Sequence, residues 1–409
     1  MNINFDLINP NSVKILQILE NHKFQAYIVG GAVRDILMDK FPHDFDICTD
    51  ALPDDMKNIF RKLGYKTVLV GEKYGTVQVL FNGEGFEVTT FRTDNGYIDG
   101  RHPESVSFSQ NLADDLKRRD FTVNALACSV GENQKINIID FFGGQSDIKN
   151  KIIRAVGDPC ERFSEDALRM LRAVRFSAQL GFEIEQKTKS AIRNLAENIT
   201  FVSKERITVE IEKILLSDNL LKIFDLSDLN LLEYIMPNLE NKCHDTTNKI
   251  NLLEKDFCVR FAALLEICSN NTDDLKNLRL KNIDKKNIKN IFSVVRIIKN
   301  NNFISKVFLK KILRDFGLYA TKSALNIMKM IYDFNALDLL REIESNNEPY
   351  KLKDLKINGI DIINITGEIT GRKIGEILSE CLNHIIEKPE NNTRDELIDF
   401  IKINFKEKN

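Results

Sequence analysis

The sequence has none of the features that mark membrane or secreted proteins. No run of about 18 apolar residues occurs, so we expect no transmembrane helix. The N-terminal residues lack the basic region and the apolar stretch of a signal peptide. The seven cysteines form no Cys-x-x-Cys pair, which predicts reduced thiols and a cytoplasmic protein. A net charge of −2 gives no sign of a nucleic-acid partner, whereas 43% hydrophobic residues predict packed domains.

Glycine is missing from a long part of the chain. Of the 19 glycines, 14 fall between Gly30 and Gly181, and none lies between Phe182 and Phe316. Glycines supply tight turns, so the first part predicts strands and loops, and the glycine-free part predicts helices. Short β-branched or aromatic segments predict the strands Phe24–Val29, Thr67–Val70, Thr76–Phe81, Phe86–Phe91 and Ile136–Ile139. Helical spacing predicts helices over Ala32–Met38 and Pro53–Leu63, and again from Phe163 onward.

Two neighbouring motifs in the first part carry chemistry. Gly30 and Gly31 separate a predicted strand from a predicted helix, where the backbone can approach an anion and Arg34 can add a charged contact. In the predicted strand His43–Ile47, the side chains of Asp44 and Asp46 point to one face. Two adjacent carboxylates repel each other unless a cation lies between them, and hard oxygen ligands suit Mg²⁺. The two motifs together indicate metal-assisted phosphoryl or nucleotidyl transfer.

A third cluster holds adjacent arginines beside an acid. Arg118 and Arg119 precede Asp120, and either arginine can form a structural ion pair or face a triphosphate. The spacing does not choose between these roles. Glu87 lies in another predicted strand and is a candidate third carboxylate, although a solvated glutamate is the simpler interpretation.

The motifs occur in an order that resembles one family. The segments that carry the resemblance are Gly30–Asp35, Asp44–Asp46, Arg118–Ala125, Glu165–Phe176 and Glu205–Ile211, with weaker similarity at 355–380. Together they resemble the class II tRNA nucleotidyltransferases, the CCA-adding enzymes, within the polymerase-β-like nucleotidyltransferase superfamily. The resemblance is strong over residues 24–215.

The resemblance implies an α+β fold with a nucleotidyltransferase head that contains a small mixed sheet, followed by an all-helical neck, body and tail. The boundaries that we predict are 1–150 for the head, 151–217 for the neck, 218–335 for the body and 336–409 for the tail. The resemblance implies that Asp44 and Asp46 are catalytic and bind Mg²⁺. The positions that match nucleotide-binding residues of the family are Gly31, Arg34, Arg119, Asp166, Arg169, Arg172 and Arg175.

The Asp166 and Arg169 pair offers a chemical way to choose bases without a template. At spacing i, i+3 on a predicted helix, one residue offers acceptors and the other offers donors. Cytosine and adenine both present an amino donor beside a ring acceptor, whereas uracil and guanine present the reverse polarity. A site that leaves buried polar groups unpaired rejects the wrong base by factors on the order of 10⁴. Arg172 and Arg175 drift around the helix, so only the resemblance places them at the site.

The resemblance therefore implies addition of CCA to the 3′ end of tRNA from CTP and ATP, with no membrane partner. The polar segment Arg92–Pro103 resembles the flexible loop of the full CCA-adding members, but an enzyme that adds only A remains an alternative. A bacterial poly(A) polymerase is the other alternative, and Val70–Thr76 resembles the CCA-adding form more closely. An appended phosphohydrolase is disfavoured, since His244-Asp245 is the only His-Asp dipeptide in the helical part of the sequence and only His384 lies beyond it.

The basic residues are concentrated in one stretch of the helical part. Between Lys276 and Arg314 there are twelve basic residues and one acid, Asp284. Such a stripe can bind a phosphate backbone, and we expect it to contact the acceptor and T arms of tRNA together with the tail. A solvated lysine-rich surface is the alternative. The sequence leaves the oligomeric state and any chemical role of Glu87 or Arg118 open.

Overall fold

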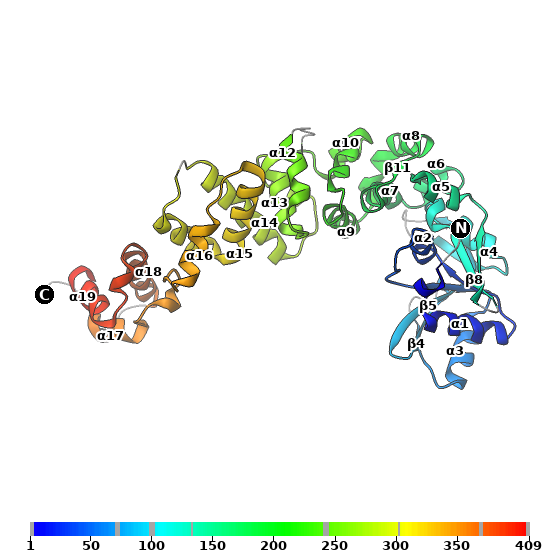
Figure 1. The fold of residues 1–409 in the computed structure, drawn as a ribbon, viewed down its shortest axis with the longest axis horizontal. Helices are drawn as coiled ribbons and strands as arrows, with labels where there is room; N and C mark the ends of the chain where they lie inside the picture. Colours follow the sequence, from blue (N-terminus) through cyan, green and yellow to red (C-terminus); the bar gives the residue numbers. More distant parts are fainter. Residues whose placement is uncertain are drawn as a thin grey trace. The chain divides into compact units, whose positions relative to one another are not determined.

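The chain divides into two units, which Figure 1 colours along the sequence. Unit 1 comprises residues 1–237 with 277–279, and unit 2 comprises 238–276 with 280–409. The computed structural model describes residues 4–69, 74–97, 103–131, 134–239, 245–301, 303–367 and 371–405. Residues 70–73, the centre of the predicted loop at 98–102, and His244 lie outside these ranges.

A mixed sheet forms the head of unit 1. In the described residues its seven strands lie in the order β3-β4-β5-β2-β1-β8-β9. Their bounds are β1 Ala26–Val29, β2 Asp46–Thr49, β3 Lys66–Leu69, β4 Thr76–Phe81, β5 Glu84–Thr90, β8 Leu126–Val130 and β9 Ile136–Asp140. Strand β2 runs parallel to β5, and the other neighbours pair antiparallel. The small mixed sheet expected from the sequence is therefore confirmed.

Helices and shorter sheets complete unit 1. The helices are α1 Pro10–Asn21, α2 Gly31–Leu37, α3 Pro53–Lys62, α4 Leu112–Lys117, α5 Gly144–Asn150, α6 Pro159–Glu165, α7 Leu168–Leu180, α8 Gln186–Leu195, α9 Lys204–Leu215, α10 Asp225–Asp228 and α11 Leu232–Ile235. Two further strand pairs are β6 Arg92–Tyr97 with β7 Pro103–Phe108, and β10 Ile152–Ile153 with β11 Glu183–Ile184. The segment predicted as a polar loop thus contributes β6 to an antiparallel hairpin.

Two packed layers position the site in unit 1. Val29 of β1, Cys48 of β2 and Ala127 of β8 pack with Leu112 and Leu116 of α4, which fixes α4 against the sheet. Burial of such apolar surface contributes roughly 25 cal/mol per Å². Helix α7 packs against α9, and Leu168, Leu171 and Val174, which recur at helical spacing in this segment, are buried. The packed sheet and the packed α7–α9 pair therefore fix the positions of the site side chains that they carry.

Unit 2 is helical throughout its described residues. Its helices are α12 Asp245–Asn248, α13 Phe257–Cys268, α14 Asn282–Lys299, α15 Lys306–Tyr332, α16 Leu337–Ser345, α17 Gly359–Thr366, α18 Gly371–Glu387 and α19 Arg394–Phe405. Helix α15 is broken at Gly317, whose φ of 80° is accessible to glycine. None of the helices in the described part of the chain combines the length and apolar character that crossing a membrane requires. The division into head, neck, body and tail stays a prediction.

Candidate active site

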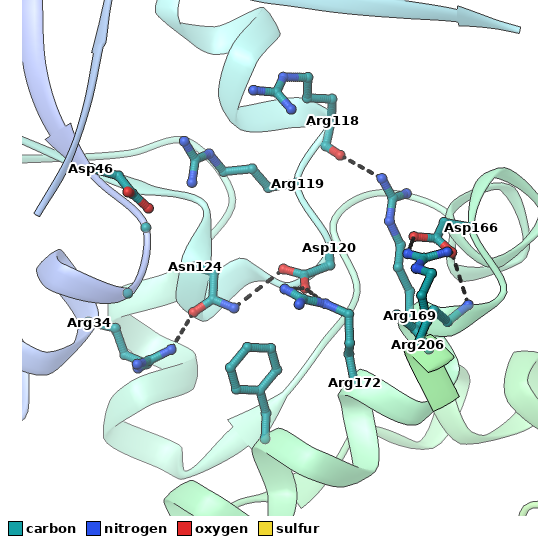
Figure 2. A pocket seen from close by; sticks show the side chains of 14 residues that line it. Arg34, Asp46, Arg118, Arg119, Asp120, Asn124, Asp166, Arg169, Arg172 and Arg206 are labelled. Carbon is teal, nitrogen blue, oxygen red and sulfur yellow. Dashed lines mark hydrogen bonds and ion pairs between the residues drawn. The ribbon is translucent and has the colours of Figure 1, made fainter. Parts of the chain in front are cut away.

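A polar cavity of about 480 Å³ lies in unit 1, beside the ends of β1 and β2 and the first turns of α7 (Figure 2). Its lining consists of Gly30, Gly31, Arg34, Asp46, Arg118, Arg119, Asp120, Asn124, Asp166, Leu168, Arg169, Arg172, Phe176 and Arg206. Six of these fourteen residues are arginine and three are aspartate. An excess of guanidinium groups suits a polyanion, since arginine binds phosphate oxygens through paired N–H donors.

The predicted glycine turn forms one wall of the cavity. Gly30 has a φ of 75° and a ψ of −135°, a conformation that side chains other than glycine rarely adopt. A Cβ atom at Gly30 would also lie 2.9 Å from a guanidinium nitrogen of Arg119, which would then have to shift. On the following helix, Arg34 donates to the side-chain oxygen of Asn124 at 2.6 Å. The structure thus brings the turn and Arg34 to the same cavity as Arg119.

A relay of hydrogen bonds connects the sheet side of the cavity with α7. Asn124, which accepts from Arg34, donates to Asp120 at 3.3 Å, and Asp120 accepts from Arg172 Nε at 2.7 Å (Figure 2). Burial disfavours ionisation of Asp120, but the Arg172 guanidinium outweighs it and lowers the pKa of Asp120. Asp120 therefore stays ionised and fixes the position of Arg172. Arg172 is one of the nucleotide-binding positions that the resemblance implied.

The adjacent arginines pair with a different acid. Asp115, which is fully buried, accepts from Arg118 at 2.7 Å and from Arg119 at 3.2 Å. Burial disfavours the cation of Arg119, but Asp115 more than compensates and raises its pKa. The guanidinium of Arg119 points toward Asp46 in Figure 2, so one fixed positive charge faces the carboxylate pair. Neither arginine forms an ion pair with Asp120 among the described residues: both pair with Asp115 and both line the cavity, so a contact with a triphosphate stays a prediction.

The carboxylate pair lies at the start of β2. The strand begins at Asp46 rather than at His43, so Asp44 precedes it, but the alternation of exposed Asp44, buried Phe45 and exposed Asp46 holds. Both aspartates line a second cavity of about 480 Å³, and Asp46 lines the first cavity as well. Desolvation raises the pKa of Asp46, Arg119 opposes the rise, and Asp44 adds to it. The two negative charges are therefore held close together at an energetic cost.

Glu87 lies near Asp44 and Asp46, a position that the sequence alone did not establish. Strand β5 runs parallel to β2 with Val88 opposite Ile47, so Glu87 lies beside Asp46 in the second cavity. Desolvation raises the pKa of Glu87, and Asp46 and Asp44 raise it further. Within the described ranges, no group of three or more acidic, His or Cys side chains is arranged to hold a metal ion. Two hard-oxygen donors with a third carboxylate nearby nevertheless suit a divalent cation, which would relieve their repulsion.

The proposed base-reading pair is arranged differently from the expectation. Asp166 does not lie on a helix face, because it is the extended residue between α6 and α7. Its carboxylate accepts from the backbone N–H of Leu168, and its carbonyl accepts from that of Arg169, so it starts α7. Both side chains still line the cavity, and Arg169 is fixed by Glu165 and by the carbonyls of Arg162 and Arg118. Asp166 and Arg169 therefore lie together at the start of α7.

Two further arginines, Arg175 on α7 and Arg206 on α9, differ in their position relative to the cavity. Arg175 does not line the cavity: it is 7% exposed and lies 3.1 Å from Glu210 of α9. Burial, followed by the neighbouring Arg172, lowers the pKa of Arg175 to about 10. Arg206 of α9 lines the cavity and binds both oxygens of Asp166, at 3.1 and 2.7 Å. The sequence contained Arg206 inside a family-like segment, but no local signal singled it out.

Comparison with known proteins finds similar sequences over nearly the whole chain. Family models match residues 26–154 as a poly A polymerase head domain, 181–243 as an RNA and SrmB-binding site of polymerase A, and 259–401 as tRNA nucleotidyltransferase domain 2. A CCA-adding enzyme of Staphylococcus haemolyticus is 35% identical over 404 residues, 96% of this chain and 97% of that protein. A CCA-adding enzyme of Lactobacillus helveticus is 52% identical over 202 residues, 49% of each chain.

A solved structure supports the same assignment. The crystal structure of the Bacillus stearothermophilus CCA-adding enzyme in complex with CTP matches with a TM-score of 0.79 and 30% identity. The match covers 97% of this chain and 98% of that one. The motif order, the mixed-sheet head and the two similarities that cover nearly the whole chain agree. The chain belongs to the family of CCA-adding enzymes, the tRNA nucleotidyltransferases.

Proposed function

We propose that this chain adds CCA to the 3′ end of tRNA from CTP and ATP, without a nucleic-acid template. One observation supports the proposal: three sets of groups line a single cavity. Its arginines can bind a triphosphate, Asp46 belongs to the carboxylate pair, and Asp166 with Arg169 can bind a base. A phosphatase would need the first two features but not the last. The relatives named CCA-adding enzymes support the reaction, and the relative solved with CTP supports that nucleotide as a substrate.

Nucleotidyltransferases of this family use a divalent metal ion, and we propose Mg²⁺, held by Asp44 and Asp46. The exposed, adjacent carboxylates at the start of β2 provide the hard oxygen donors that this ion prefers. When bound there, the ion would neutralise phosphate charge and favour the ionised form of the attacking hydroxyl. Glu87 lies close enough to add negative potential at the same place.

The residues of the chain have separate roles in the proposed transfer. The 3′-hydroxyl of tRNA attacks the α-phosphate, a new P–O bond forms, and pyrophosphate leaves. Arg34 and Arg119, both fixed by hydrogen bonds, would bind the triphosphate and stabilise charge as the leaving group departs. The turn at Gly30 and Gly31 allows the phosphates to approach the backbone closely. Arg172 would complete the phosphate-binding wall from the helical side.

Base choice would rest on Asp166 and Arg169. Asp166 accepts a hydrogen bond from the amino group that cytosine and adenine share, and Arg169 donates to the adjacent ring nitrogen. Uracil and guanine would place a carbonyl against the carboxylate, which leaves both groups without a donor. One protein pair can therefore accept two bases of different size and exclude the other two.

We propose that tRNA binds partly through a lysine-rich surface on unit 2. Lys281, Lys285 and Lys286, on and just before α14, form no ion pair with a carboxylate among the described residues, whereas Lys289 interacts electrostatically with Asp273. Towards the end of the predicted basic stripe, by contrast, Lys299, Lys306, Lys310 and Lys311 each pair with a glutamate inside unit 2. Only part of the stripe is thus available for the acceptor and T arms.

We also place the protein in the cytoplasm, where thiols stay reduced. Cys48, Cys128, Cys160, Cys258, Cys268 and Cys381 are free. Buried free thiols such as Cys48 and Cys128 are typical of reducing compartments.

A single assay separates this function from its alternatives. A tRNA that ends before CCA is incubated with CTP, with ATP or with both, and the added nucleotides are sequenced. Full CCA addition predicts two C residues with CTP alone and C-C-A with both. An enzyme that adds only A requires a tRNA that already ends in CC, and a poly(A) polymerase continues with A. Failure to incorporate CTP would contradict the proposed function.

The metal-binding pair provides a second test. We expect Asp44→Ala to abolish incorporation of CTP and ATP alike, because it removes half of the carboxylate pair. Asp54→Asn is a matched control, since Asp54 is 82% exposed on α3 and lies outside both cavities. Incorporation by the Asp44 variant at the wild-type rate would overturn the assignment.

A further inference from the structure

The carboxylate of Asp166 has a nearly full set of hydrogen bonds. A carboxylate accepts about four. Its Oδ1 accepts from the N–H of Leu168 at 3.1 Å and from Arg206 Nη1 at 3.1 Å, and its Oδ2 accepts from Arg206 Nη2 at 2.7 Å. The described residues supply no fourth donor, so one acceptor position remains, on Oδ2. Since Asp166 lines the cavity, this position is available to a bound base.

Arg169 is limited in the same way. Its Nη1 donates to Glu165 and to the carbonyl of Arg162, and its Nη2 donates to the carbonyl of Arg118. A guanidinium has five N–H groups, so the contacts among the described residues leave two. Asp166 and Arg169 together therefore offer a base one hydrogen-bond acceptor and two donors.

We infer that Arg206 is a specificity-determining residue that acts through Asp166, a role that rests on the proposed function. Its two hydrogen bonds fix the plane of the carboxylate and occupy one side of both oxygens. The remaining acceptor can then face a base amino group in only one orientation. Arg206 is a positioning residue, because Asp166 and not Arg206 contacts the base in this arrangement.

The location of Arg206 explains why a single carboxylate needs this support. Asp166 is the extended residue between α6 and α7, and apart from Arg206 its carboxylate is held by one backbone N–H. An aspartate with one hydrogen bond can rotate and turn either oxygen toward the base. Arg206 is on α9, which packs against α7, and its side chain is 21% exposed, so it anchors the carboxylate from a second helix. Rotation would allow uracil to be accepted, with its carbonyl beside Arg169.

The test is base discrimination by the full-length enzyme with Mg²⁺. Incorporation of CTP and of UTP into tRNA that ends before CCA is measured as kcat/KM for wild type, Arg206→Met and Arg206→Lys. We expect the CTP-to-UTP ratio of Arg206→Met to fall roughly 10- to 100-fold, the factor carried by a hydrogen bond to a charged group. Lys keeps the charge but cannot bind both oxygens in the same plane, so its ratio should lie between the two.

Controls separate this role from a structural one. A variant that only loosens the fold lowers CTP and UTP incorporation alike and leaves their ratio unchanged. Arg154→Met removes an arginine that pairs with Asp147 and Glu185 outside the cavity, and its ratio should equal that of wild type. If wild type incorporates CTP but both Arg206 variants keep its ratio, the inference is wrong and the proposed function stands. If wild type incorporates no CTP, both fail.

Discussion

The Asp120–Arg172 pair offers a prediction whose magnitude follows from the structure. Arg172 contacts Asp120 Oδ2 through Nε at 2.7 Å and through Nη2 at 2.5 Å. Asp120→Asn keeps the shape of the side chain, and its amide oxygen can still accept from the N–H of Phe121. The NH2 group then takes the place of Oδ2, so the change removes both the negative charge and the acceptor that face Arg172. Among the described residues Asp120 is the carboxylate that forms an ion pair with Arg172, whereas Glu210 and Asp166 act on it through weaker electrostatic interactions.

The expected loss of stability comes from burial. Hydrogen bonds to charged groups contribute about 1.5–3 kcal/mol, and breaking a fully buried pair costs about 3–5 kcal/mol. The side chain of Asp120 is 9% exposed, whereas that of Arg172 is 32% exposed, so water offsets part of the loss. We expect about 2 kcal/mol at pH 7. For a unit of this size that corresponds to a fall in Tm of roughly 4–8 °C.

The pH dependence adds a second, independent measurement. Because the folded state lowers the pKa of Asp120 from its ordinary value of 3.8, the pair stabilises the fold above that pH. This contribution is lost as the pH falls below 3.8 through the folded-state pKa. The Tm of wild type and Asp120→Asn, measured by calorimetry, should therefore differ at pH 7 and converge in acid. Asp54→Asn on exposed α3 should change Tm very little. Equal Tm values for the two variants at pH 7, or a difference that persists at the acid end, would refute the reasoning.

The remaining predictions concern packing and RNA binding. Gly144→Ala should destabilise unit 1 by about 3 kcal/mol or more, because the new Cβ would lie 2.3 Å from the carbonyl oxygen of Thr122; denaturant unfolding tests this. Gly157→Ala, with φ of 71° but open space around it, should cost only about 1–2 kcal/mol. Affinity for tRNA should fall as salt rises, and Lys286→Gln with Lys289→Gln should reduce the salt slope by about 2. A slope unchanged by the two lysine substitutions would place the phosphate contacts elsewhere.

The head fold could be predicted where a segment carries its own pattern. The sequence predicts strand β4 residue for residue over Thr76–Phe81, because this short segment contains β-branched and aromatic residues and lies between Gly75 and Asn82. Strand β8 was missed, although it lies between β1 and β9 in the sheet. Its sequence, Leu-Ala-Cys-Ser-Val, is buried at nearly every position, so no alternation marks it. The hairpin β6–β7 was missed for another reason: its polar side chains and Gly96 are typical of a loop.

The candidate site was predictable to the extent that its residues lie within short motifs. The glycine turn, the carboxylate pair and Asp166 with Arg169 each occupy a few consecutive positions, and their residue types carry the chemistry. The contacts that fix these groups join distant positions. Arg206 binds Asp166 across 40 residues, and Arg172 binds Asp120 across 52. No periodicity connects such positions, so pairing could not be assigned before the chain was folded.

This difference has a consequence for how the site selects its substrates. The motif residues determine which groups can contact a nucleotide, but their partners determine how many hydrogen bonds each group still has to offer. In the proposed complex Asp166 offers the base one acceptor, because Arg206 and the N–H of Leu168 use the others. The same carboxylate with a freer set of lone pairs would accept more than one arrangement of donors. Under the proposed roles of Asp166 and Arg206, base choice is a property of the packed α7–α9 pair, and substitutions on α9 should alter it without touching the nucleotide.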